Sequence, residues 1–524
     1  MDLKERALSE CCNDKTTAHH GGDGRPFWNA QAFQFMYNPC FQFAVAPGCK
    51  RYLFTAKDAF GKEHSFEADS PMSLLTPIWR DIPEGMVELR VEALDDSGKP
   101  FTLVGARSFY KTASFPGPEY YPPKARPYKE CAKKAYEYAI SQSYVRYWLD
   151  HDTPDPEYDF NVYPSKTLSA LICGMINYAK IEPSVAKDAL QIAKNAADFL
   201  ISISFSEDKP LKHLPPTYYV DFRKDLSKYN NESAIVRGHA MMMIYPAAVG
   251  SAYLELEKTT GETRYLEAAR RIAVFYKENI LPNGSWYLFL SVESGEPLKN
   301  NYCVPFDIMK FMNALYVRTG EETWKRIEEK CFDYIIKNCL ETYNWEGQFE
   351  DSHFSEDYSN LSCIPACAMI DYIYDNKAED KELIKEAEEL MRFIEDQFVI
   401  WKSFAPWNHA VNPVQGGNIN EWYSPAGLEQ YYWAMPIDWT TAHIMRSFLQ
   451  IYEFNKDPLL LSKAEVLGDM LTRMQKESNG FIPTQWMRES CIEDEKHFWL
   501  NCMLETAKCL LYIGEVKERI TNKI

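Results

Sequence analysis

The chain has 524 residues, of which 46% are hydrophobic and 25% are charged, values that are typical of soluble globular proteins. Its formal net charge of −18 argues against a nucleic acid or an anionic membrane as partner, because both call for a basic protein surface. A chain of this length exceeds what one ordinary core supports, so we expect two domains, one of them large.

The first residues lack the basic start and apolar centre of a signal peptide, and no stretch approaches the length of a membrane span. We therefore expect a cytoplasmic protein, or a periplasmic one if an export signal has been removed. The fourteen cysteines show no disulfide-framework spacing, which indicates reduced thiols. No two histidines share a helical face with a carboxylate, so we expect no metal and no cofactor.

The N-terminal quarter of the chain divides into three segments of different composition. Residues 1–26 are polar and predict a flexible arm. Residues 27–115 contain short alternating segments such as RYLFTAKD and MVELRVEALD, separated by turn signals at Ala46-Pro47-Gly48 and Asp95-Asp96-Ser97-Gly98. They predict a β-sandwich of immunoglobulin or fibronectin type. Residues 116–127 are rich in proline and predict a stiff linker.

Residues 128–524 show helical periodicity to the end of the chain. Amphipathic helices, which would face water on one side, are expected to begin near Tyr128, Ser184, Glu262, Glu321, Glu379 and Pro458. More apolar helices, which would be covered on every side, are expected to begin near Ser165, Arg237, Asp307, Leu361, Ile437 and Glu493. Six such hairpins predict an (α/α)6 toroid, with an open solenoid as the alternative.

The loops that lead into the apolar helices are long and rich in aromatic and acidic residues. They cover residues 150–165, 205–236, 281–306, 340–360, 399–436 and 477–492. Alternate loops of a ring emerge at one end, so these six should converge around one mouth, where we expect the site. Trp286 and Trp422 lie in these loops and are candidates for stacking on sugar rings.

The most regular repeat begins with NNESAIVRGHAMMMIYPAAVGSAYLELEKTTGETRYLEAARRIAVFY. It resembles a stretch of the unsaturated glucuronyl hydrolases and related toroid glycosidases, including β-glucuronidases, in which an acidic residue and Ser precede Ala-Arg-Gly-Gln-Ala. The matching residues are Glu232, Ser233, Arg237, Gly238, Ala240, Tyr265, Leu266, Glu267, Ala268 and Ala269, with His239 in place of the family's Gln. The match covers about 50 residues.

The resemblance implies a toroid enzyme whose general acid and base is an Asp at the start of an apolar helix. The corresponding place here falls in NVYPSKTLSA, where Ser165 and Lys166 stand and no carboxylate is present. Lys166 is therefore a candidate cationic anchor for substrate, although a lysine at a helix start also reaches solvent readily.

Arg237 and His239 are expected in the first turn of an apolar helix, where backbone amides and two donor side chains favour a substrate carboxylate. The alternative is an ion pair between Arg237 and a nearby loop acid such as Glu232. Both residues are retained as candidate substrate-binding residues.

Hydrolysis of a glycosidic bond requires two carboxyl groups, one protonated and one ionised. The segments WEGQFEDSHF and NINEWYSP place acids beside aromatic rings, which stack on sugars and exclude water. Asp351 and Glu421 are therefore the preferred catalytic carboxylates, and Glu232 is a third candidate.

The sequence thus predicts a glycoside hydrolase that acts at chain ends of oligosaccharides containing uronic acid. The second hypothesis is a lyase or epimerase of uronates, with Tyr431, Tyr432 and His409 as acid and base. The third is a non-catalytic glycan-binding protein, which the aromatic loops also suit. In every case the expected partner is an oligosaccharide, not a nucleic acid or a membrane.

Overall fold

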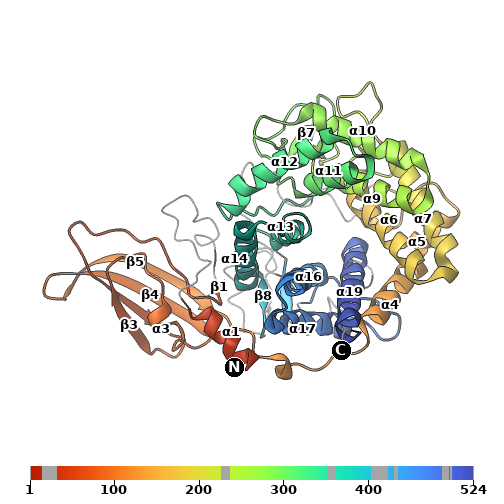
Figure 1. Cartoon of the computed structure of the whole chain (residues 1–524). Helices are drawn as coiled ribbons and strands as arrows, with labels where there is room; N and C mark the ends of the chain where they lie inside the picture. Colours follow the sequence, from red (N-terminus) through yellow and green to blue (C-terminus); the bar gives the residue numbers. More distant parts are fainter. Residues whose placement is uncertain are drawn as a thin grey trace.

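The computed structural model describes residues 2–13, 32, 34–225, 236–350, 361–402, 423–429, 435–486, 495 and 498–522. Within these ranges the chain forms a five-stranded sheet near its N-terminus and a ring of helices beyond it (Figure 1). No helix in this part of the chain is long and apolar enough to cross a membrane.

Twelve helices of the described chain form two concentric layers (Figure 1). The inner layer consists of α6 (Pro164–Ile181), α9 (Tyr245–Thr260), α11 (Phe306–Thr319), α13 (Cys363–Asn376), α16 (Asp438–Asn455) and α19 (Leu500–Thr521). The outer layer consists of α4 (Tyr128–Ser141), α7 (Ala186–Ile203), α10 (Thr263–Asn279), α12 (Glu322–Ile335), α14 (Lys381–Phe398) and α17 (Pro458–Met474).

The ring is closed. Each inner helix packs against the next one in chain order, and α19 packs against α6. The outer helix α4, the first of the ring, pairs with α19, the last, so the two ends of the helical region meet. The predicted toroid of six hairpins is therefore confirmed, and an open solenoid is excluded.

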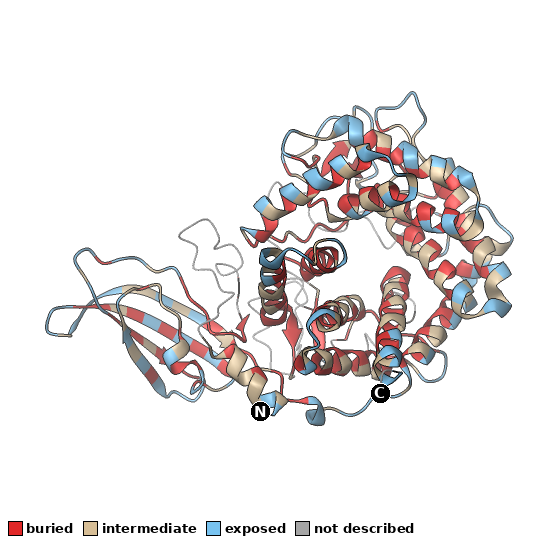
Figure 2. Cartoon of the chain, viewed as in Figure 1, coloured by how far each residue is buried: buried red, intermediate tan, exposed pale blue. Residues whose placement is uncertain are grey.

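Local sequence explains where these helices begin and end. Ser362 and Asp380 cap α13 and α14 by accepting hydrogen bonds from the first backbone N–H groups. Gly261 and Gly320 follow α9 and α11 with φ of 74° and 71°, a left-handed conformation that glycine adopts without strain. Figure 2 shows that burial is concentrated on the inner layer, whereas the outer helices alternate between buried and exposed positions.

The predicted start of α9 is wrong. Residues 237–239 form a turn, and β6 (Ala240–Met242) then pairs antiparallel with β7 (Phe289–Ser291) before the helix begins at Tyr245. Pro246 lies in the first turn of α9, where its missing N–H costs nothing. The apolar run before it is short enough to suit a buried strand as well as a helix, which is why periodicity alone placed the start too early.

The N-terminal region forms one sheet with strand order β1-β5-β4-β2-β3. Its strands are β1 (Gln34–Phe35), β2 (Tyr52–Lys57), β3 (Glu63–Ala68), β4 (Gly85–Leu94) and β5 (Pro100–Lys111), and β1 runs parallel to β5. Gly98 ends the predicted Asp95–Gly98 turn, with its N–H donating to Asp95 O at 2.9 Å. The described residues give a single sheet where two facing sheets were predicted.

Two short helices accompany the sheet. α1 (Leu3–Cys11) begins the chain, so part of the predicted flexible arm is helical, and α3 (Thr76–Trp79) buries Trp79. The shorter elements are α5 (Ser143–Arg146), η1 (Pro118–Tyr120), η2 (Tyr147–Leu149), η3 (Asp159–Val162), η4 (Pro183–Val185), η6 (Ile336–Leu340), β8 (Val399–Ile400), β9 (Ala426–Leu428) and β10 (Pro436–Ile437).

The end of α14 joins the sheet to the ring. Glu395 accepts hydrogen bonds from the Tyr37 hydroxyl at 3.0 Å and from Lys463 Nζ at 2.7 Å. The next residue, Asp396, accepts the backbone N–H groups of Met36 and Tyr37 at 2.5 and 2.8 Å. Both carboxylates are buried. Buried charge of this kind is tolerable only while its partners stay in place, so the sheet and the ring depend on each other.

Asp396 should make stability depend on pH. Burial raises the pKa of Asp396 from 3.8 to about 7. Because the folded-state pKa lies above the unfolded-state value, this group favours the folded state fully below about pH 4, and that contribution is lost as pH rises through 7. Asp396→Asn should therefore flatten the fall of the unfolding free energy over this window, about 1.4 kcal/mol for each pKa unit. Urea denaturation at several pH values measures it.

Asp380→Asn is the matched control, because Asp380 caps the same helix from an exposed position. An unchanged pH slope in Asp396→Asn would contradict the assignment of the raised pKa to Asp396.

Candidate functional site

The ring encloses a cavity of about 440 Å³, a size typical of small-molecule sites. All six inner helices line it, and each contributes side chains only from its first three turns. The starts of the six inner helices therefore lie at the same end of the ring, as the predicted toroid requires.

Several loops reach this end. Ile244, Val304 and residues 346–349 line the cavity from the segments that precede α9, α11 and α13. Loop 150–165 is described in full and contributes no lining residue, whereas loops 205–236, 399–436 and 477–492 fall partly outside the described residues. The expected convergence of loops is thus seen for loops 281–306 and 340–360.

Glu350 is the centre of a buried polar cluster beside the cavity. Its side chain is 0% exposed, and Lys166 Nζ donates to Glu350 Oε1 at 2.6 Å. The Tyr245 hydroxyl contacts the other carboxylate oxygen and accepts the Glu350 backbone N–H at 3.2 Å. Lys166 also lies 4.2 Å from the centre of the Trp499 ring. Lys166 and Tyr245 line the cavity, and the Glu350 carboxylate, which does not line it, holds both side chains in place by hydrogen bonds.

Arg237 belongs to the same cluster, but it binds a backbone carbonyl where a substrate carboxylate was predicted. Its Nη1 donates to the Glu350 backbone carbonyl at 2.6 Å, and the Tyr218 hydroxyl donates to the same oxygen at 2.9 Å. Arg237 is half-buried and is not among the cavity-lining residues. The structure therefore brings Arg237, Lys166 and Glu350 together, with Arg237 supporting the loop.

His239 is exposed, and its Nδ1 lies 3.0 Å from the Val236 carbonyl. Neither Arg237 nor His239 lies in the first turn of a helix, because α9 begins at Tyr245. The predicted carboxylate site at a helix N-terminus is therefore wrong for these two residues.

Arg237→Ala should lower the unfolding free energy by about 1.5–3 kcal/mol, the range for a hydrogen bond with a charged partner. It should affect acidic and neutral glycosides alike, because Arg237 does not line the cavity. Urea denaturation and turnover of paired glycosides test both points, with Arg271→Ala on the exposed face of α10 as control. A loss confined to acidic glycosides would restore Arg237 as a carboxylate anchor.

The other predicted residues divide into two groups. Trp286 is 2% exposed, and its indole N–H donates to the Tyr276 carbonyl at 3.0 Å, so it belongs to the core and cannot stack on a sugar. The rest lie outside the described residues and stay predictions: Glu232, Asp351, Glu421, Trp422, His409, Tyr431 and Tyr432.

Five carboxyl groups that the sequence did not single out line the cavity: Glu255, Asp307, Glu346, Asp371 and Glu505. Two of them lie at the end where the inner helices start: Asp307, in the first turn of α11, and Glu346, in the loop before α13. Burial raises the pKa of Asp307. Gln348 Nε2 donates to Glu346 Oε2 at 2.9 Å, and Gln348 is itself held by the Val304 N–H and the Tyr302 carbonyl. The signal for Asp307 was its place at the start of an inner helix.

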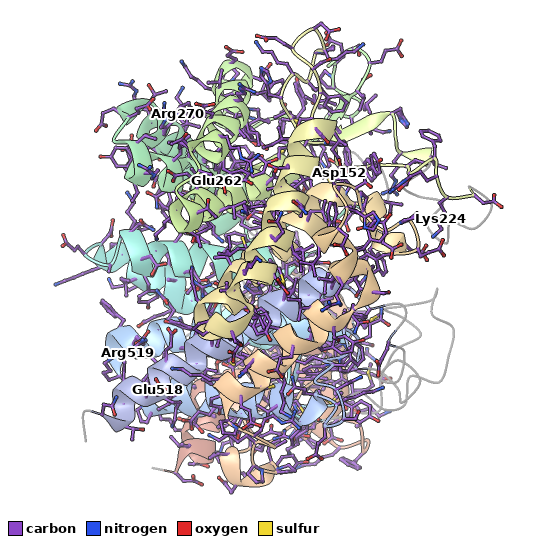
Figure 3. All side chains as sticks on the ribbon, turned by 90° about the vertical axis from the view of Figure 1, so that its right-hand side faces the viewer. Asp152, Lys224, Glu262, Arg270, Glu518 and Arg519 are labelled. Atoms are coloured by element: carbon purple, nitrogen blue, oxygen red, sulfur yellow. The ribbon has the colours of Figure 1, made fainter. Side chains whose placement is uncertain are left out.

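Other acids in or beside the long loops either bind neighbouring side chains or are exposed. Asp438 is buried and accepts from the Thr506 hydroxyl at 3.0 Å, and Asp159 pairs with Lys224. Figure 3 shows Asp152 on the outer flank of the ring, where it is exposed. Among the described residues no group of three or more His, Cys, Asp or Glu side chains could hold a metal ion.

No protein-family model matches this chain, and no curated protein matches it. Solved structures that are similar include a family 76 glycoside hydrolase from a bovine Bacteroides thetaiotaomicron strain, at 11% identity and a TM-score of 0.44, over 91% of this chain and 99% of that one.

Two further similar structures carry other activities in their names. Cellobiose 2-epimerase from Spirochaeta thermophila is 12% identical, with a TM-score of 0.47, over 73% of this chain and 98% of that one. An unsaturated glucuronyl hydrolase specific for heparin is 11% identical, with a TM-score of 0.45, over 75% and 98%. Similarity of this extent does not assign an activity, so the function must be argued from the cavity itself.

Proposed function

We propose that this protein is a glycoside hydrolase that works in the axial cavity, with Asp307 as proton donor and Glu346 as ionised carboxylate. Hydrolysis needs two carboxyl groups held in different protonation states. Burial raises the pKa of Asp307 and favours its protonated form, and Glu346 accepts a hydrogen bond from Gln348 Nε2 at 2.9 Å. The presence of a protonated Asp307 and a second carboxyl group, Glu346, at the same end of one cavity carries the proposal.

In this mechanism Asp307 gives its proton to the glycosidic oxygen as the bond to the departing sugar breaks. Glu346 stabilises the positive charge that develops on the anomeric carbon, and acts as base towards water or as nucleophile. Phe306, Trp439 and Tyr245 line the same cavity and offer ring faces to a sugar.

The finer proposal is that the enzyme removes a uronic acid from the end of an oligosaccharide, as a β-glucuronidase does. Four of the inner helices place a cationic side chain on the cavity wall: Lys166, Lys310, Arg446 and Lys508. Three of these form ion pairs with acids, whereas Lys310 forms none among the described residues. A sugar that carries a carboxylate can pair with Lys310, which a neutral sugar cannot. Glu232, Asp351 and Glu421 remain alternative catalytic carboxylates in this proposal.

Epimerisation or elimination at a uronate is the second candidate, because His443 also lines the cavity. Burial lowers the pKa of His443 to about 3, so its imidazole is neutral and a weak base at physiological pH. A weak base suits hydrogen bonding to a hydroxyl better than removal of a carbon-bound proton, which favours the hydrolase.

Incubation with uronic-acid oligosaccharides separates these functions. A hydrolase produces new reducing ends without ultraviolet absorbance from a double bond. Absorbance that rises with cleavage would indicate a lyase, and deuterium uptake from D₂O without cleavage would indicate an epimerase. Binding with no chemical change would identify a glycan-binding protein, and each of these last three results would overturn the hydrolase.

A further inference from the structure

The deep end of the cavity carries a layer of charged side chains, here called the charged floor. Its members come from the second and third turns of four neighbouring inner helices, α11, α13, α16 and α19. They are Lys310, Asp371, His443, Arg446, Glu505 and Lys508. At a rise of about 1.5 Å per residue, these side chains begin about 6–12 Å below the helix starts, deeper than Asp307.

The charged floor contains two internal ion pairs. Arg446 Nε lies 3.1 Å from Asp371 Oδ2, and Lys508 Nζ lies 3.1 Å from Glu505 Oε2. Lys310 is exposed to the cavity and has no ion-pair partner among the described residues. With His443 neutral, three cations face two anions, which leaves a net charge of +1 (3 − 2) on the floor.

The charged floor also offers unused hydrogen-bonding atoms. Within the described chain, Asp371 Oδ1 and His443 Nε2 are buried and make no hydrogen bond. Buried polar atoms in proteins nearly always have a partner, so their free positions suit a ligand that brings hydroxyl groups. Acceptors and donors beside Lys310, a cation that forms no ion pair among the described residues, make a set that matches a polyol carrying one negative charge.

The cavity has no described lining residue beyond the third turn of any inner helix, although α16 continues to Asn455 and α19 to Thr521. The charged floor therefore lies at the deep end of the described cavity, and Asp307 and Glu346 lie at the end where the helices start.

We propose that the charged floor is a binding subsite for a monosaccharide that carries a carboxylate, and that the free acidic sugar bound there inhibits the enzyme competitively. Lys310 pairs with the carboxylate, while Asp371 and His443 bind hydroxyl groups. The proposal rests on the hydrolase proposed above, because the sugar cut from a chain end would occupy the floor.

The test uses the full chain and free glucuronate, with glucose as the neutral counterpart, in isothermal titration calorimetry. Glucuronate should bind at least about tenfold more tightly than glucose, and Lys310→Met should remove that difference. Lys310→Arg should restore part of it, and Lys277→Met, at an exposed position of α10, should leave it intact. Equal binding of the two sugars, or an undiminished preference in Lys310→Met, would overturn the proposal.

Measurements of binding and of turnover distinguish failure of the subsite proposal from failure of the hydrolase proposal. If glucuronate binds through Lys310 but no glycoside is cleaved, the hydrolase is wrong and the subsite stands. If glycosides are cleaved but glucuronate neither binds nor competes with substrate, the subsite is wrong and the hydrolase stands. Circular dichroism of Lys310→Met confirms folding, which is expected because this side chain is exposed.

Discussion

Asp307→Asn should lower kcat on an oligosaccharide by about 10²–10⁴-fold, the contribution that general acid–base catalysis usually makes. Asn has nearly the same shape as Asp but no proton of suitable acidity to give to the departing oxygen. Glu346→Gln should cause a loss of similar size, because an uncharged amide cannot stabilise the positive charge at the anomeric carbon. Both losses are read from initial rates of reducing-end formation.

The pH profile adds a second readout. Because burial raises the pKa of Asp307, its protonated form persists to higher pH than an ordinary Asp, and activity should fall once pH exceeds that raised value. This basic limb of kcat/KM should be missing in Asp307→Asn. Asp333→Asn, at an exposed position of the outer helix α12, is the control. Wild-type turnover in Asp307→Asn would remove Asp307 from the mechanism.

The second large effect concerns the junction between the sheet and the ring. Lys463→Met should lower the unfolding free energy by about 3–5 kcal/mol, because it leaves the buried carboxylate of Glu395 without its cation. The two side chains are only 2% and 3% exposed, so water cannot replace the lost partner. Glu395→Gln should be costly for the same reason, since Lys463 would then be buried alone.

The double variant Glu395→Gln/Lys463→Met should recover much of this loss, since no unpaired charge remains. Lys385→Met, which breaks an exposed pair with Glu382, should change stability little. Additive losses in the double variant would show that the Glu395–Lys463 pair is not coupled. Deletion of residues 1–115 removes Tyr37 and the backbone donors to Asp396, so we expect that protein to aggregate.

The helical ring was predictable because its signals are local. Apolar residues at 3.6-residue spacing marked the helices, and Gly261 and Gly320 marked two of their ends. The start of α9 was not predictable, because MMMI before Pro246 suits a buried strand and a helix equally. Trp286 shows the same difficulty for side chains, since a loop tryptophan stacks on a ligand in one fold and fills a core in another.

Most residues that line the cavity could not be predicted, because no single stretch of the sequence contains them. Asp307 and Lys310 lie one turn apart on α11, but Glu346 comes from a loop and Asp371 and Arg446 from two other helices. Sequence reasoning favoured acids with aromatic neighbours in the chain, whereas closure of the ring gives Asp307 its neighbours from distant segments. Lys166 was selected for its place at a helix start, and its pairing with Glu350 emerged only from the fold.

The role of Asp307 as proton donor is tested most directly by the leaving group. Aryl glycosides whose departing phenol is strongly acidic need no protonation, whereas those with weakly acidic phenols do. In Asp307→Asn, kcat/KM should stay within about tenfold of wild type for the first kind and fall by about 10²–10⁴-fold for the second. Equal losses for both kinds, or no loss for either, would contradict hydrolysis by acid catalysis from Asp307.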